Sequence, residues 1–121
     1  MDLRLSGRTA LITGGSRGIG FGVAQSLAAE GCNLRLASRT AADLEAVREK
    51  LLAAHKVQVE MHPGDLAQSG HVKRLGQACR SVDILVNNAG AIPQGTLAGL
   101  DEKTWRESWD LKVFGFIGLA R

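Results

Sequence analysis

Several residue types are scarce in this chain of 121 residues, which has no tyrosine, two cysteines, two prolines and 4% aromatic residues. Cys32 and Cys79 fall within apolar patterns without metal-type spacing, so we interpret both as small core residues in a reducing compartment. His55, His62 and His71 are scattered among polar neighbours, which disfavours a metal site. The chain has no apolar leader and no run of about 18 apolar residues, and we therefore expect a soluble, cytoplasmic protein.

Charge of one sign is not in large excess either. Lysine and arginine number 15 against 12 for aspartate and glutamate, a formal net charge of +3, and the basic residues are dispersed along the chain. This pattern does not favour nucleic acid or an anionic membrane as a partner. Hydrophobic residues make up 45% of the chain, which is enough for the core of one ordinary domain.

A glycine-rich segment, Thr13–Gly20, joins an apolar run at 9–12 to a helical pattern. A strand, a glycine-rich turn and a helix in this order form a phosphate site, because the anion then lies at the positive helix N-terminus. Gly14 suits the tight turn, Gly18 lets backbone N–H groups approach a pyrophosphate, and Gly20 lets the helix pack close to the sheet. No Gly-Lys-Ser/Thr follows, which disfavours a P-loop kinase or ATPase. The alternative is a glycine-rich turn without a ligand.

Hydrophobic periodicity predicts strands that alternate with helices along the chain. This order favours right-handed βαβ crossovers and an α/β fold of Rossmann type, with a parallel sheet in the strand order 3-2-1-4 and helices on both faces. The sheet is expected to be incomplete at the C-terminus. The expected strands are 9–12, 32–36, 57–61 and 82–86, and the expected helices begin near 19, 40, 72 and 101.

Local signals refine two of the helices. Ile19, Val23 and Leu27 recur every four residues beside the small residues Gly20, Ala24 and Ala28, which together predict a lean apolar stripe that lies on the sheet. Thr40 and Asp43 have the spacing of a capping box, with Asp in place of the usual Glu, at the start of the second helix.

The carboxyl ends of the strands are expected to form one ligand-binding rim, because ligands of such sheets bind where the strand order reverses. Ser38–Arg39 follows the second strand about 20 residues past the glycines, where an acid would bind the ribose of NAD and an arginine the 2′-phosphate of NADP. Arg17, inside the glycine turn, could reach the same phosphate. NADP is therefore favoured over NAD, and the alternative is two exposed arginines without a ligand.

Two motifs, Thr13-Gly14-x-x-x-Gly18-Ile19-Gly20 and Asn87–Gly90, resemble those of short-chain dehydrogenases/reductases. The resemblance covers essentially the whole chain, but only about the first half of such a domain. It implies that residues 1–121 are the truncated N-terminal part of a larger single NADP-binding domain. It also implies an adenine contact at Asp65–Leu66, where the alternative is a simple turn or helix cap. The cofactor-binding residues that we predict are Gly14, Ser16, Arg17, Gly18, Ile19, Gly20, Ser38, Arg39, Asp65, Leu66, Asn88, Ala89 and Gly90.

The resemblance also implies that a Tyr-x-x-x-Lys pair carries out proton transfer, assisted by a Ser and an Asn. Because this chain has no tyrosine, the resemblance implies that its proton-transfer group lies downstream of Arg121 or is absent, and that the chain alone is inactive. Lys112 stands where the family's Asn is expected, and a charged lysine donates hydrogen bonds but does not accept them. Lys112 is our candidate catalytic residue. The alternatives are a degenerate site and a lysine that snorkels beside Trp105 and Trp109.

The resemblance implies an oxidoreductase with NADP-linked hydride transfer to or from a small carbonyl or alcohol substrate, for which this chain supplies the cofactor site. One alternative is a non-catalytic NADP-binding or regulatory module, which Lys112 would suit. Another is a nucleotide-sugar epimerase, but its Gly-x-x-Gly-x-x-Gly spacing is not met. The helix from Asp101 onward carries an apolar stripe of Trp105, Trp109, Val113, Phe116 or Ile117, and Ala120. An exposed face with tryptophans is consistent with a homo-oligomer of the full-length protein.

Overall fold

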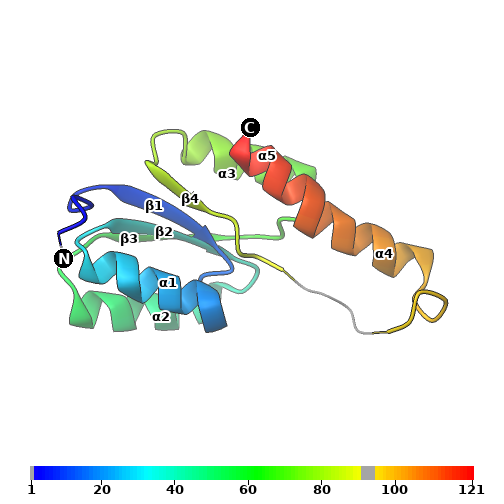
Figure 1. Cartoon of the computed structure of the whole chain (residues 1–121), viewed down its shortest axis with the longest axis horizontal. Helices are drawn as coiled ribbons and strands as arrows, with labels where there is room; N and C mark the ends of the chain where they lie inside the picture. Colours follow the sequence, from blue (N-terminus) through cyan, green and yellow to red (C-terminus); the bar gives the residue numbers. More distant parts are fainter. Residues whose placement is uncertain (1, 91–94) are drawn as a thin grey trace.

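The computed structural model describes residues 2–90 and 95–121, and within them the strands form a parallel sheet (Figure 1). The strand order is β3-β2-β1-β4, which confirms the predicted order. β1 pairs with β2 on one side and with β4 on the other, so that Ala10 lies opposite both Leu34 and Ile84. The strands are β1 (Thr9–Thr13), β2 (Asn33–Ser38), β3 (Val59–Pro63) and β4 (Ile84–Val86).

Helices cover both faces of the sheet (Figure 1). α1 (Gly18–Ala29) and α2 (Ala41–Ala54) lie on one face, and α3 (Ser69–Ala78) lies on the other. A long rod shares the α3 side and consists of α4 (Glu102–Trp109), a π-helical segment η1 (Asp110–Gly115) and α5 (Phe116–Ala120). The α5 end packs beside α3, whereas the α4 end extends past the carboxyl edge of the sheet. No helix of the described residues is long and apolar enough to cross a membrane.

Each face of the sheet has its own hydrophobic core. Successive side chains of a strand point to opposite faces, so Leu11 and Ile12 of β1 enter different cores. Cys32 belongs to the core under α1 and α2, and Cys79 belongs to the core under α3. Both are free and buried, which confirms their interpretation as core residues.

The small residues of the predicted α1 stripe are the ones that the structure buries. Gly20, Ala24 and Ala28 are the buried residues, whereas Ile19 is 79% exposed and does not belong to the buried face. Val23 and Leu27 are partly buried and pack at the margin of the core. The helix lies close to the sheet, so its smallest side chains fit between them best.

The predicted capping box at the start of α2 is wrong. The Thr40 side chain makes no capping hydrogen bond, and the Asp43 carboxylate instead pairs with the Arg17 guanidinium at 3.2 Å. The box pattern did mark the correct helix start, because α2 begins at Ala41 with Thr40 as its extended N-cap residue.

The predicted C-terminal helix is interrupted by η1, which the sequence pattern did not reveal. Of the predicted stripe, Trp109 is 55% exposed and Ile117 is 53% exposed. Phe116, the alternative to Ile117 in that stripe, does pack against the α3-side core, together with Leu111 and Leu119, which the prediction did not include. A π turn holds one residue more than an α turn does, so the residues on either side of it face different directions from those that a regular helix would give.

Candidate functional site

A pocket of about 320 Å³ lies at the carboxyl ends of the strands, where the strand order reverses between β1 and β4. We call it the rim pocket. It is lined by residues that follow β1, β2, β3 and β4, together with the first turn of α2 and one residue of η1. These residues are Gly14, Ser16, Arg17, Ser38, Arg39, Thr40, Asp43, Gly64, Leu66, Asn88, Ala89, Gly90 and Leu111.

The glycine turn that begins the pocket depends on backbone conformations that favour glycine. Gly14 has φ +69° and Gly18 has φ +51°, and both values lie in the left-handed region. The Gly14 N–H donates to Ala37 O of β2 at 2.8 Å, which ties the turn to the neighbouring strand. A Cβ on Gly20 would overlap Gly14 O and would lie 2.6 Å from Asn88 Nδ2. The N-terminus of α1 can therefore approach the turn only because residue 20 has no side chain.

Thr13, the last residue of β1, joins the glycine turn to the segment after β4. Its fully buried Oγ1 accepts hydrogen bonds from the N–H groups of Asn88 and Ala89, both at 3.0 Å. The Asn88 amide returns a bond to Gly14 O at 3.3 Å. The Asn87 side chain donates to Phe116 O at 3.3 Å, which connects the same segment to α5. These bonds hold the glycine turn and the Asn87–Gly90 motif in a fixed relation.

The charged side of the rim pocket consists of Arg17, Arg39 and Asp43. The Arg17 side chain is 83% exposed and forms the 3.2 Å ion pair with Asp43 described above. Arg39 is exposed and has no ion-pair partner within residues 2–90 and 95–121. Ser16 and Ser38, each next to one of these arginines in the sequence, have their hydroxyl groups 3.3 Å apart. This side of the pocket presents positive charge and hydroxyl donors, a combination that suits a phosphate group.

The segment after β3 contributes Gly64 and Leu66 to the pocket, whereas the Asp65 carboxylate accepts the Ala67 N–H at 2.9 Å. The His71 ring packs against Gly64 and fills the space that a Cβ at this position would need. The Nε2 atom of His71 is buried and has no hydrogen-bond partner in the described part of the chain. Burial, and then the nearby Arg74 guanidinium, lower the pKa of His71 below its ordinary value of 6.5.

Lys112 lies in η1, at the end of the pocket formed by Gly90. Its Nζ is 4.8 Å from the centre of the Phe116 ring and would lie 3.6 Å from a Cβ on Gly90. A Cβ on Gly115 would lie 3.0 Å from Leu66 O, so this glycine allows η1 to approach the segment after β3. π segments occur frequently at functional sites. Lys112 is exposed, and its predicted catalytic role remains a prediction.

Most of the residues predicted from the sequence meet at the rim pocket. Five of the predicted residues do not line it, namely Gly18, Ile19, Gly20, Asp65 and Lys112. The two glycines act on the shape of the turn, and Ile19 points to solvent. We did not predict Thr13, Gly64 or Leu111 as site residues. We predicted Thr40 and Asp43 only as parts of a helix cap. Thr13 could have been predicted as a site residue, because its hydroxyl stands at the end of a buried apolar strand.

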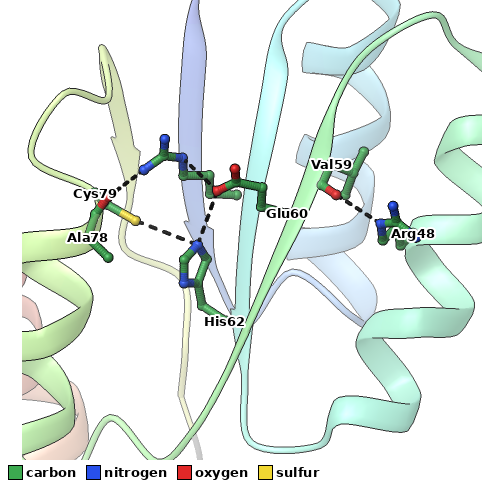
Figure 2. A network of polar contacts seen from close by, with 7 residues as sticks. Arg48, Val59, Glu60, His62, Ala78 and Cys79 are labelled. Carbon is green, nitrogen blue, oxygen red and sulfur yellow. Dashed lines mark hydrogen bonds and ion pairs between the residues drawn. The ribbon is translucent and has the colours of Figure 1, made fainter.

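A second polar cluster lies at the edge strand β3 and includes none of the residues that line the rim pocket (Figure 2). His62 Nε2 is 3.6 Å from the Glu60 carboxylate and 4.0 Å from Cys79 Sγ. The Arg35 guanidinium pairs with Glu60 at 3.2 Å and donates to Ala78 O at 2.6 Å. Among the described residues, no group of three or more His, Cys, Asp or Glu side chains has a geometry that could hold a metal ion. The cluster connects β2, β3 and the end of α3.

The comparisons with known proteins agree with this architecture. The family model described as short chain dehydrogenase matches residues 8–121. Galactitol 2-dehydrogenase of Agrobacterium fabrum is 35% identical over 114 residues, which cover 93% of this chain and 44% of that protein. D-beta-hydroxybutyrate dehydrogenase of Cupriavidus necator is 33% identical over 105 residues, which cover 84% of this chain and 40% of that protein.

A solved structure gives the same result. The structure of L-sorbose reductase from Gluconobacter frateurii, complexed with NADPH and L-sorbose, superposes with a TM-score of 0.94 at 34% identity. The match covers 100% of this chain and 48% of the reductase. The chain thus spans a little under half the length of these relatives. Because the family model matches nearly all of it, the chain belongs to the short-chain dehydrogenase family.

Proposed function

We propose that residues 1–121 are the N-terminal, NADP-binding part of a larger single oxidoreductase domain. The observation that carries this proposal is the rim pocket, which combines a glycine turn at a helix N-terminus with two arginines beyond β1 and β2. Its support includes the L-sorbose reductase above, whose structure contains NADPH, and a metagenomic short-chain oxidoreductase solved with NADP at a TM-score of 0.89.

The described residues fit the parts of a dinucleotide. The N-terminus of α1 and the left-handed Gly18 offer backbone N–H groups to the pyrophosphate. Ala89 and Gly90 leave room for a ribose against the backbone beyond β4. Leu66 and Asp65 are our candidates for the adenine contact, of which Leu66 lines the pocket directly. When bound, the nicotinamide supplies or accepts the hydride.

The reaction that we propose is hydride exchange with a small carbonyl or alcohol compound. It needs a proton donor beside the substrate oxygen, and this chain has no tyrosine to serve as one. Lys112 is our candidate catalytic residue, because its ammonium group lies next to Gly90 at one end of the pocket. The ammonium group lies over the Phe116 ring and places a positive charge near Gly90. A charged lysine donates hydrogen bonds but does not accept them. We expect the chain alone to bind cofactor without turnover.

Charge reversal at Arg39 tests the cofactor assignment. A charge-assisted hydrogen bond contributes about 1.5–3 kcal/mol, so Arg39→Asp is expected to weaken NADPH binding by about tenfold to a hundredfold. NADH, which has no 2′-phosphate, is expected to lose much less affinity. Binding is measured by nucleotide fluorescence titration, with Arg80→Asp as a control at an exposed position outside the rim pocket. Equal losses for the two nucleotides would refute the 2′-phosphate assignment.

A second candidate function is a non-catalytic NADP-binding module. Lys112 favours it, because a charged lysine at the position of the family's relay Asn cannot accept a hydrogen bond. The two candidates differ in turnover of NADPH by the full-length protein across a panel of ketones and aldehydes. Oxidation of NADPH that depends on the carbonyl compound would support the enzyme, and tight NADPH binding without turnover would support the module.

A further inference from the structure

The rim pocket contains its own negative charge on the side that carries its arginines. Asp43 lies in the first turn of α2, and its carboxylate pairs with the Arg17 guanidinium at 3.2 Å across the pocket mouth. The Asp43 side chain is 39% exposed, so the pair is accessible to solvent and to a ligand that enters from this side. Arg39, on the same side, has no such partner in the described residues.

The Asp43 carboxylate can pair with Arg17 because it does not cap the N-terminus of α2. The N–H groups of a first helical turn have no partner within the helix, and the Thr40 side chain does not cap them here. Thr40 and Asp43 both line the rim pocket instead. This side of the pocket therefore offers hydroxyl groups and two guanidinium groups, one of which is already paired with a carboxylate.

A phosphate group that enters this end of the pocket competes with Asp43 for the same guanidinium. The phosphate carries more negative charge than the carboxylate and has more acceptor oxygens. The exposed Arg17–Asp43 pair is weak enough to exchange, since exposed ion pairs typically contribute between nothing and about fivefold to an equilibrium constant. An NAD-type nucleotide presents only a ribose hydroxyl at this point and does not need to displace the carboxylate.

We propose that Asp43 is a specificity-determining residue that competes with the 2′-phosphate of NADP for Arg17 and thereby lowers the preference for NADP over NAD. This inference rests on the proposed cofactor site. Asp43 acts as an internal counterion: it holds Arg17 at the pocket mouth while the phosphate is absent and reduces the net gain when the phosphate binds. Its removal leaves Arg17 available to the phosphate.

The test compares Asp43→Asn with Glu45→Gln, which removes the same charge at an exposed position of α2 outside the rim pocket. NADPH and NADH dissociation constants are measured at low and at physiological salt. We expect Asp43→Asn to tighten NADPH binding by about threefold to fivefold at low salt, with a smaller gain at higher salt. NADH binding and the Glu45→Gln variant are expected to change by less than about twofold.

A double-mutant cycle with Arg17→Gln tests the competition itself. The gain from Asp43→Asn is expected to vanish when Arg17 is already replaced. A gain that persists in the Arg17→Gln background would show direct repulsion of the phosphate and would overturn the competition. Unchanged NADPH affinity in Asp43→Asn, with NADPH still bound by the unmodified protein, would overturn this inference alone. If the unmodified protein binds neither nucleotide, the proposed function fails as well.

Discussion

Replacement of the Thr13 hydroxyl measures how much its hydrogen bonds to the segment after β4 contribute to the free energy of unfolding. In Thr13→Val, the side chain keeps nearly the same shape but no longer accepts the N–H groups of Asn88 and Ala89. A donor that is left buried without a partner costs about 1–3 kcal/mol. Since the Asn88 bond is only partly buried, we expect Thr13→Val to lower the free energy of unfolding by about 2–4 kcal/mol.

Thr13→Ser is the matched control, because it keeps the oxygen and removes one buried methyl group. Loss of the methyl group is expected to cost about 1 kcal/mol. Unfolding in urea, followed by far-ultraviolet circular dichroism, gives both free energies when the slopes agree. Amide hydrogen exchange at Ala89 adds a local readout, with lost protection expected only in Thr13→Val. A Thr13→Val protein as stable as Thr13→Ser would refute the proposed role of this hydroxyl.

Two further predictions concern a glycine and a histidine near the rim. Gly20→Ala is expected to lower the free energy of unfolding by about 1–3 kcal/mol, because its Cβ would overlap Gly14 O. Gly22 lies in open space on the same helix, so Gly22→Ala is the control and is expected to raise the free energy of unfolding by about 0.5–1 kcal/mol. Both values are measured by the same urea titration. The pKa of His71 is lowered in the folded state, so its contribution to stability is full above the unfolded-state value of about 6.5 and is lost as the pH falls below it. His71→Gln is therefore expected to flatten the decline of unfolding free energy below pH 6.5, and an unchanged slope would contradict this.

The sequence was sufficient for the arrangement of the sheet because strand order follows from local signals. Each apolar run that was followed by a glycine or a short polar turn became a parallel strand, and crossover handedness then left few alternatives. The same reasoning located the rim, since residues that follow parallel strands meet at one edge. The predicted roles of individual rim residues in binding remain predictions.

The details that sequence reasoning missed depend on contacts between distant segments. Asp43 had the spacing of a helix cap, but its partner proved to be Arg17, which only the folded sheet brings near. Nothing near His71 in the sequence indicates that its ring fills the space beside Gly64. The exposure of Ile19 follows from the close approach of α1 to the sheet, which periodicity does not measure.

The π segment of the C-terminal rod has a consequence for insertions and deletions. An α-helix turns by about 100° per residue, and a π turn holds about one residue more than an α turn, so Asp110–Gly115 turns the chain about as far as an α-helix one residue shorter would. Removal of one residue within this segment would therefore restore a regular helix and leave α4 and α5 in nearly the same relation. The same deletion within α4 would instead turn the preceding residues by about 100° around the axis, because the α5 end is fixed by its packing beside α3. The π segment is thus the part of the rod where a residue can be lost while Trp105 and Trp109 keep their direction.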